Sequence, residues 1–467
     1  MAPSLTPPAS RARPTLILAV VLVSYFMIVL DNSIVFTGLT RIREDLAFST
    51  SGLSWVQNAY ALVFGGLLLL AARAGDIVGP RRIFIIGLTI FSSASLLIGL
   101  SPTAEWMIAA RALQGIGSAI LAPTSLALLT ANFAEGTART KAIAAYGSTA
   151  GIGASLGLVV GGVIADLTSW RVGFLINVPI GIALIIATLI LISETPRARG
   201  RFDVSGAITS TAGMTALVYG VTRTADYGWS DLWALVFIAC GLTLLAAFVV
   251  IETRAAQPIL PLRVLRDRMR GGAFIARMLF AGSIFGYFFF ISQYMQTVLD
   301  STPLQAGIAF LPMTVVQFVL SLIVPRLTHR IGNAALVTIG LAITLAGMTW
   351  LSFVNVDSTY WLGVAPAMLL LGAGQGLGFA PLTAAGVIGI EPRDAGAASG
   401  AVNVAHQLGG ALGVSVMVAV GSAAAQGTGI TAVAAETSAG LTTGAVLLAL
   451  ALTSALALVL PASRRPR

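Results

Sequence analysis

The chain has 467 residues, of which 57% are hydrophobic and only 10% are charged. Soluble domains carry about 25% charged residues, so this composition excludes a soluble protein. The formal net charge is +9, but the basic residues are scattered between apolar stretches, which indicates membrane topology rather than nucleic-acid binding. A single cysteine, Cys240, excludes an internal disulfide framework.

Apolar windows recur along the whole chain at about the 20-residue length that a helix needs to cross a bilayer. None of them alternates with the period of two that is typical of barrel strands. The run after Arg11 and Arg13 resembles a signal peptide but lacks a small-residue cleavage site, so we expect an uncleaved first span. The sequence predicts an all-α polytopic membrane protein with fourteen spans: 15–38, 53–72, 83–100, 105–129, 141–165, 170–193, 204–222, 232–251, 272–297, 304–325, 333–354, 359–386, 397–421 and 440–460.

The basic residues distinguish the two sides of the membrane. Most of the 27 Lys and Arg residues lie near the two termini or after even-numbered spans. The other side collects only Arg41, Arg43, Arg171 and Arg223. Basic residues gather in cytoplasmic loops. We therefore predict a multi-pass protein of the inner or plasma membrane with both termini in the cytoplasm.

A faint internal repeat divides the chain. The segment RAGDIVG at 73–79 has the same spacing as RLTHRIG at 326–332, and QGIG at 114–117 recurs as QGLG at 375–378. Paired repeats with a site at their interface are typical of secondary transporters. We predict two six-helix bundles with two inserted helices between them, in domains 1–200, 201–254 and 255–467.

Six short motifs follow one another along the chain: LDNSIV at 30–35, GDIVGPRR at 75–82, RALQGIG at 111–117, GASLGLVVGG at 153–162, WRVGFLINVPIG at 170–181 and ASGAVNVAHQLGG at 398–410. In this order they resemble the major facilitator superfamily, and within it the fourteen-span drug:proton antiporters. The resemblance covers nearly the whole chain and implies the major facilitator fold. Ala72 and Ile77 depart from the loop motif, and Leu158 replaces a proline of the fifth-span motif.

Two opposite charges lie deep inside predicted spans. Arg111 costs about 2.5–3.5 kcal/mol there unless it is paired or faces water. Asp31 is the one carboxylate expected to be well buried, because the other acids fall in loops or at span ends. At 1.5 Å per residue the two lie about 10–13 Å from the same membrane face. We predict a proton-coupling pair, and a static structural ion pair is the alternative.

Two other groups are predicted to control conformational change. The loop after the second span is interpreted as a conformational latch, although its arginines could simply mark the cytoplasmic face; its residues are Gly75, Asp76, Gly79, Arg81 and Arg82. Rows of small residues let helix backbones approach closely. The resemblance implies that the fifth-span row seals a route at the seam between the halves; its residues are Gly153, Gly157, Gly161 and Gly162.

Polar and aromatic residues on inner faces suit a large apolar substrate with few obligatory hydrogen bonds. Those predicted to line the cavity are Gln57, Tyr60, Gln114, Tyr287, Phe290, Gln293, Asn403 and His406. The aromatic residues could instead anchor the helices at the membrane interface, and His406 could be a neutral core residue rather than a titrating one. Arg277, near the start of the ninth span, is expected to snorkel to the surface.

Together these features predict a proton-coupled secondary exporter of hydrophobic, cationic drugs or toxic compounds. Its expected partners are the substrate, protons and the lipid bilayer, without nucleic acid, and we expect a monomer. The glycines at 372–378 lie inside a span rather than after a strand, so they are no dinucleotide fingerprint, and no P-loop lysine motif or metal cluster occurs. The chain is therefore expected to need no cofactor or metal and to be no enzyme. The alternatives are an exporter of a specific metabolite, antibiotic or lipid, and a non-transporting membrane sensor or receptor.

Overall fold

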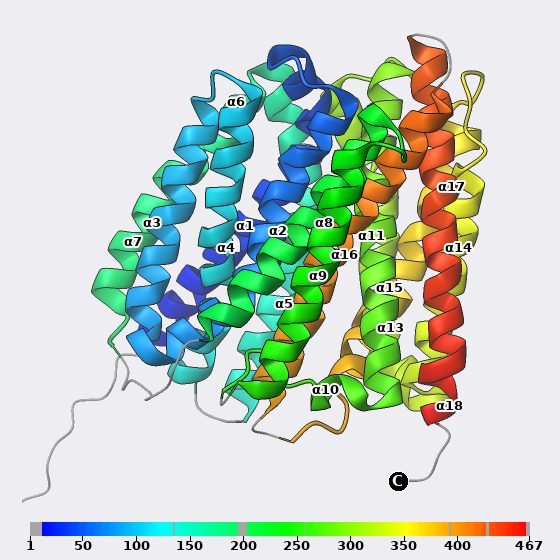
Figure 1. Cartoon of the computed structure of the whole chain (residues 1–467). Helices are drawn as coiled ribbons and strands as arrows, with labels where there is room; N and C mark the ends of the chain where they lie inside the picture. Colours follow the sequence, from blue (N-terminus) through cyan, green and yellow to red (C-terminus); the bar gives the residue numbers. More distant parts are fainter. Residues whose placement is uncertain are drawn as a thin grey trace, which may run out of the picture.

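A computed structural model describes residues 12–133, 136–194, 203–255, 257–391, 394–425 and 429–463. This part of the chain is helical and contains no strand (Figure 1). Within it, fourteen helical segments are long and apolar enough to cross a membrane. The predicted all-α polytopic class and its fourteen spans are therefore confirmed.

The first six spans pack together as an N-terminal bundle, in which α1 contacts α5, and α4 contacts both α2 and α3. The sixth span consists of two helices, and Pro179 stands in the first turn of the second, where its missing N–H costs no helical hydrogen bond. The bundle comprises α1 (Ala12–Asp45), α2 (Thr50–Val78), α3 (Pro80–Gly99), α4 (Ala104–Asn132), α5 (Thr137–Leu167), α6 (Trp170–Leu175) and α7 (Asn177–Leu191).

The last six spans form a C-terminal bundle around α11, which contacts α15, α16 and α17. Pro312 stands in the first turn of α13, where the tenth span is divided. The bundle comprises the short α10 (Arg263–Arg266), α11 (Arg268–Thr297), α12 (Pro303–Ala309), α13 (Leu311–Ile331), α14 (Asn333–Leu351), a π-helical turn (Tyr360–Val364), α15 (Ala365–Val387), α16 (Ala395–Ala424), α17 (Ile430–Ser454), a second π-helical turn (Ala455–Val459) and α18 (Leu460–Ser463).

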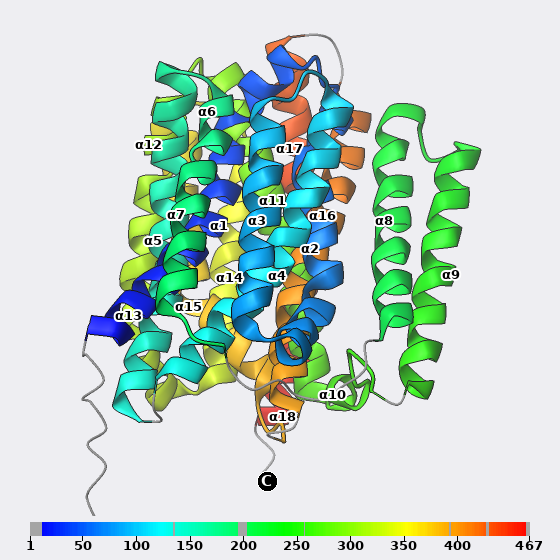
Figure 2. The same ribbon diagram turned by 90° about the vertical axis from the view of Figure 1, so that its left-hand side faces the viewer.

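The two inserted helices, α8 (Val204–Tyr227) and α9 (Leu232–Arg254), pair with each other at one edge of the molecule (Figure 2). Only α8 makes extensive contact with the bundles, through α2 and α16. Ser415 of α16 ties the three helices together, because its hydroxyl accepts hydrogen bonds from Asn58 Nδ2 and Thr222 Oγ1, each at 2.8 Å. The predicted domain boundaries fall in the connections that flank this pair and stay predictions.

Some helices extend beyond the predicted spans. The last long helix begins at Ile430 rather than near residue 440, and the first continues to Asp45 rather than ending near 38. Hydropathy marks only the part of a helix that crosses the apolar layer. Ala and Glu are strong helix formers, so α17 continues through 431–439 despite its polar residues.

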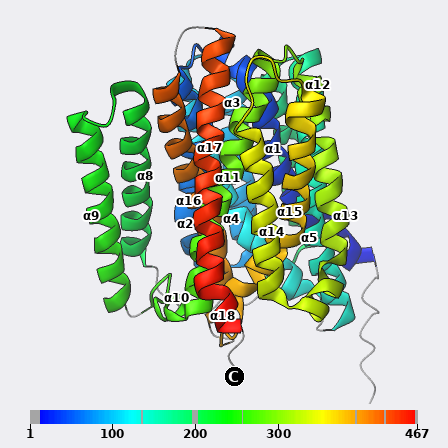
Figure 3. The same cartoon turned by 90° about the vertical axis from the view of Figure 1, so that its right-hand side faces the viewer.

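We call the side where α1 begins and α18 ends the terminal side, and the opposite side the distal side (Figure 3). On the distal side the two bundles touch through α1 and α11: Ser292 Oγ donates to the Phe36 carbonyl at 2.6 Å, and Gln296 Nε2 to the Thr37 carbonyl at 3.3 Å. Helices α5 and α12 also meet there, so close that a Cβ added to Gly162 would lie 2.6 Å from the Pro303 carbonyl oxygen. We call these contacts the distal seam.

Candidate functional site

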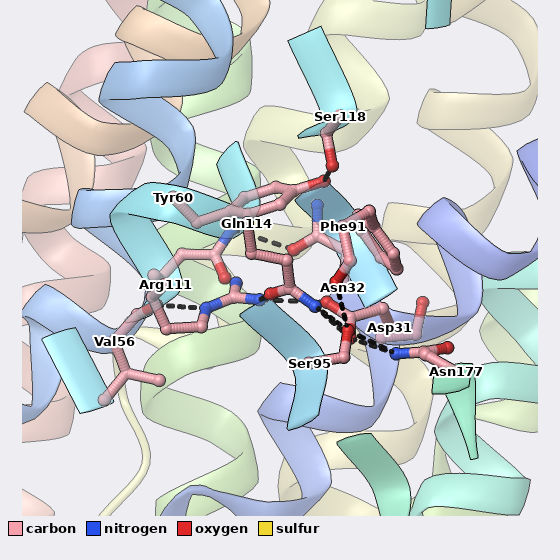
Figure 4. Close-up of polar contacts among 12 residues, drawn as sticks. Asp31, Asn32, Val56, Tyr60, Phe91, Ser95, Arg111, Gln114, Ser118 and Asn177 are labelled. Carbon is pink, nitrogen blue, oxygen red and sulfur yellow. Dashed lines mark hydrogen bonds and ion pairs between the residues drawn. The ribbon is translucent and has the colours of Figure 1, made fainter. Parts of the chain in front are cut away.

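The structure brings Asp31 and Arg111 together in the N-terminal bundle (Figure 4). Nη1 of Arg111, on α4, donates to Oδ2 of Asp31, on α1, at 2.9 Å, and both side chains are 0% exposed. An intramembrane arginine is tolerated when it is paired in this way. The two residues were predicted to lie at similar depths, and in the structure they form a direct ion pair.

Three neighbouring side chains complete the surroundings of the carboxylate. Its other oxygen, Oδ1, accepts hydrogen bonds from Gln114 Nε2 at 2.9 Å and Asn177 Nδ2 at 2.8 Å. Gln114 also donates to Ser95 Oγ at 2.8 Å and accepts from Arg111 Nη1 at 2.5 Å. Both carboxylate oxygens therefore receive donors, which suits the ionised form of Asp31. Asn177 lies within the sixth-span motif, so the motif could have suggested it, whereas no sequence signal singles out Ser95.

Helix α2 contacts the Arg111 guanidinium through a backbone carbonyl and an aromatic ring. Its Nε donates to the Val56 carbonyl at 2.9 Å, and its Cζ lies 4.3 Å from the centre of the Tyr60 ring, a cation–π contact. The hydroxyl of Tyr60 donates to Ser118 Oγ at 2.8 Å. Nearby, Gln57 Nε2 donates to Asn32 Oδ1 at 2.9 Å. Three of the predicted cavity residues, Gln57, Tyr60 and Gln114, therefore surround the ion pair.

The other predicted cavity residues lie in the C-terminal bundle and do not gather at one place. Phe290 points into its own bundle, where a Cβ added to Gly440 would lie 2.6 Å from the ring. Tyr287 is buried with its ring edge-on to Phe310 at 6.0 Å, and Gln293 donates to a carbonyl of its own helix. Asn403 is exposed and likewise bonds to its own helix.

His406 packs against two aromatic rings. The ring centres of Phe285 and Phe379 lie 5.2 and 5.8 Å from the imidazole centre. Its Nδ1 has no hydrogen-bond partner among the residues that the structure describes. The histidine is therefore held by aromatic contacts rather than by a described carbonyl.

The loop predicted as a latch contacts its own bundle. Gly79 has φ 109°, a conformation that favours glycine, and it separates α2 from α3. Arg81 Nη2 donates to the Leu189 carbonyl at 2.8 Å, and Arg82 Nε lies 3.3 Å from a Glu194 carboxylate oxygen. Leu189 lies in the last turn of α7 and Glu194 three residues beyond its end, so both contacts of the loop stay within the N-terminal bundle. Gly75 lies in the last turns of α2, and the side chain of Asp76 lies outside the described part.

The fifth-span glycines face two different helices. A Cβ added to Gly157 would lie 2.6 Å from Ser33 Cβ, and one added to Gly161 would lie 2.7 Å from Ile34 Cα, both on α1. Gly153 also faces α1, whereas Gly162 faces α12 at the distal seam. The row therefore fixes α5 against the helix that carries Asp31, and its last member reaches the other bundle.

Two expectations about buried charges are wrong. Arg277 does not reach the surface but is only 3% exposed, because α11 begins at Arg268 and places it about 13 Å along the helix. Asp31 is also not the one well-buried acid, since Glu252 is 4% exposed and Asp203, Asp394 and Glu436 are each 9% exposed. These acids do lie near helix ends, as expected, but neighbouring segments cover them.

Comparison with known proteins places the chain in a family. The model of the Major Facilitator Superfamily matches residues 21–414. The chain is 40% identical to the cephamycin export protein CmcT of Amycolatopsis lactamdurans over 89% of this chain and 86% of the relative, and 36% identical to the puromycin resistance protein pur8 of Streptomyces alboniger over 87% and 82%. It is 32% identical to a tetracenomycin C resistance and export protein of Streptomyces glaucescens over 88% and 77%.

Solved structures share the fold. A peptide transporter, POT, aligns with a TM-score of 0.72 at 12% identity, over 98% of this chain and 96% of that one. An aspartate-to-alanine mutant of the nucleoside transporter NupG aligns with a TM-score of 0.67 at 14% identity, over 95% and 99%. At these identities the two transporters show the fold alone, whereas the more similar relatives include proteins named as exporters. The chain therefore belongs to the Major Facilitator Superfamily, with antibiotic export and resistance proteins among its relatives.

Proposed function

We propose that this protein is a proton-coupled secondary exporter of small amphipathic compounds of the antibiotic type, which works by alternating access. The observation that carries the proposal is the fully buried Asp31–Arg111 pair, because ionisable groups kept inside a membrane domain mark ion pathways and proton relays. The names of four relatives, which give export of or resistance to single antibiotics, support the substrate class.

Proton exchange follows from the cost of separating the pair. While Arg111 donates to it, Asp31 is stable as a carboxylate. A movement of α1 against α4 that breaks this contact leaves a buried, unpaired carboxylate, which is strongly unfavourable. Uptake of a proton relieves that cost, and return of Arg111 expels the proton again. One acid can therefore bind and release one proton per conformational cycle.

The same helix connects the pair to the closure between the bundles. Asp31 lies on α1, and Phe36 and Thr37 of that helix accept the hydrogen bonds of the distal seam. Opening the seam requires α1 to move relative to α11. Since α1 carries both features, we infer that opening of the seam and separation of the ion pair are coupled.

We also propose the orientation and the assembly. The basic residues gather on the terminal side, which would then face the cytoplasm, and the distal seam would close the outer route. The two bundles of one chain already form the seam, so a monomer suffices. The loop from Gly75 to Arg82 would act as the latch, exchanging its contacts with α7 for contacts with the other bundle during the cycle.

Asp31→Asn tests the coupling role. We expect the variant to insert normally but to lose gradient-driven export, measured as accumulation of a panel of dyes and antibiotics in cells with and without a protonophore. Purified parent protein in detergent should release protons when substrate is added, and the variant should not. The control is Asp357→Asn, an exposed loop acid, which should behave as the parent. Parent-like proton release from Asp31→Asn would move the coupling role elsewhere, with His406 as the next candidate.

A dedicated exporter of one antibiotic is the second candidate. The names of four relatives each give a single antibiotic, namely cephamycin, puromycin, tetracenomycin C and lincomycin. The same panel separates the two candidates, because a dedicated exporter protects against one chemical series, whereas a multidrug exporter protects against several unrelated ones.

A further inference from the structure

Arg277 is a buried cation that the proposed coupling mechanism does not use. Only 3% of the residue is exposed, and its Nε and Nη1 have no hydrogen-bond partner among the described residues. The structure also shows no ion pair for it within the described part of the chain. An arginine cannot lose its charge in proteins, so this charge stays buried without a carboxylate partner among the described residues, which is costly.

One aromatic ring lies directly over this guanidinium, and the other side chains that act on its charge come from both bundles. Its Cζ lies 3.8 Å from the centre of the Phe379 ring of α15. On α1, Tyr25 lies within electrostatic reach and stacks on Tyr146 of α5, with ring centres 4.0 Å apart. His406 of α16 also lies within electrostatic reach. The cluster thus spans the interface between the bundles, and α1, α5, α11, α15 and α16 all contribute to it.

The cluster is open on one side and lies near the coupling pair. Phe379, whose ring lies over Arg277, is 38% exposed, so the aromatic side of the site is not covered by the rest of the protein. Along α1, Tyr25 precedes Asp31 by about 9 Å of helix rise, toward the terminal side. A molecule that enters from the terminal side would therefore meet the Arg277 cluster before the ion pair.

We propose that Arg277 binds the anionic head of an amphiphile, such as a carboxylate, while the aromatic cluster holds its apolar part. The planar guanidinium offers two parallel N–H donors that match a carboxylate or phosphate oxygen pair. The proposal rests on the proposed export function and specifies the charge of its substrate. A cationic substrate, which the sequence led us to expect, would be repelled here, whereas an anion supplies the acceptor that no described side chain supplies. Two sources share this chemistry, a carboxylate-bearing solute and the phosphate of an anionic lipid.

Binding of three probes of one shape tests the charge preference. The probes are 1-pyrenebutyrate, 1-pyrenebutanol and 1-pyrenebutylamine, which carry a negative charge, no charge and a positive charge. Binding to purified protein in detergent is followed by energy transfer from tryptophan to pyrene, after partition into empty micelles is subtracted. A charge-assisted hydrogen bond contributes about 1.5–3 kcal/mol, so the parent should bind the carboxylate about tenfold or more tightly than the alcohol.

Two variants assign this preference to Arg277. In Arg277→Gln the carboxylate and the alcohol should bind within about twofold of each other, while Arg326→Gln, the same change at an exposed arginine of α13, should keep the parent's preference. Arg277→Met should raise the unfolding temperature, because it removes a buried unpaired charge. A merely structural arginine would lower it when replaced.

A competition experiment with lipid distinguishes a carboxylate-bearing solute from the phosphate of an anionic lipid. The parent and Arg277→Gln are titrated with phosphatidylglycerol against the bound probe. Arg277-dependent preference for pyrenebutyrate supports a solute carboxylate, and Arg277-dependent displacement by phosphatidylglycerol alone supports the lipid phosphate. If Arg277→Gln changes neither, the anion site is wrong. These measurements use no proton gradient, so they can succeed even if gradient-driven export is absent.

Discussion

At the scale of single residues, the site depends on how completely one carboxylate is supplied with donors. Asp31 receives Arg111, Gln114 and Asn177 from two different helices, and Gln114 is fixed in turn by Ser95. A partly satisfied polar network inside a membrane domain would be costly. Donors reach both oxygens of the Asp31 carboxylate, which explains why this charge is compatible with a core that has no access to solvent, whereas Nη2 of Arg111 has no hydrogen-bond partner among the described residues.

Arg111→Ala should destabilise the protein more than Asp31→Asn. The alanine leaves a buried carboxylate without its counter-ion, a loss of about 3–5 kcal/mol, and it also empties the volume of a fully buried side chain beside Tyr60. Asparagine keeps the shape of Asp31, and Arg111 keeps its bond to the Val56 carbonyl. Thermal unfolding in detergent measures both variants. Replacing both residues, as Asp31→Asn with Arg111→Gln, should restore part of the loss, and a double variant as unstable as the sum of the single ones would contradict the pairing.

At the scale of elements, α5 positions α1 and also closes the distal seam. Gly157 and Gly161 let the backbone of α1 approach, while Gly162 lets α12 approach from the other bundle. Small residues are needed at both places because van der Waals packing, rather than a hydrophobic driving force, holds membrane helices together. A single helix therefore connects the position of Asp31 to the state of the seam.

Gly162→Leu should open the distal seam. The added side chain cannot fit beside the Pro303 carbonyl, so the equilibrium should shift away from this closed state and export should fall. Gly147→Leu is the matched control, since it lies on the same helix and an added Cβ there meets nothing within 4 Å. The measurement is labelling of a cysteine introduced by Thr37→Cys, in a Cys240→Ser background, with a membrane-impermeant thiol reagent. We expect labelling to rise several-fold with Gly162→Leu alone; equal labelling in both variants would exclude the seam role.

At the scale of the whole molecule, the two bundles contact each other at two separate places. Helices α2 and α16 contact each other and both contact α8, and Ser415 of α16 accepts one hydrogen bond from α2 and one from α8. The distal seam, by contrast, is made by α1 and α5 with α11 and α12. This arrangement suits rocking of one bundle against the other, with α8 as a side support that stays attached to each.

The orientation in the membrane is tested by reporter fusions. Fusions after Arg201 and Arg270 should report the cytoplasm, and fusions near Asp226 and Asp300 the outside, because the basic residues gather on the side of the termini. A fusion after Arg270 that reports the outside would show that the count of spans before it is odd in the membrane, against the two-bundle arrangement with an inserted pair.

The amino-acid sequence by itself determined the number of spans and the pairing of the deepest charges. Both depend on one-dimensional quantities. The length of an apolar window counts the crossings, and the rise per residue gives Asp31 and Arg111 the same depth. The fold class also followed from the length of the apolar runs, because a helix is the structure in which such a run can form all its backbone hydrogen bonds within lipid.

Only the tertiary structure decided which face of each helix turns inward. In a membrane protein the lipid-facing and core-facing sides are both apolar, so periodicity does not distinguish them as it does for a helix in water. The sequence therefore missed Ser95, placed Phe290 in a cavity although it packs inside its bundle, and sent Arg277 to the surface. The burial of Arg277 depends on neighbours far apart in the chain, such as Tyr25 and Phe379, which only the packing of the two bundles brings together.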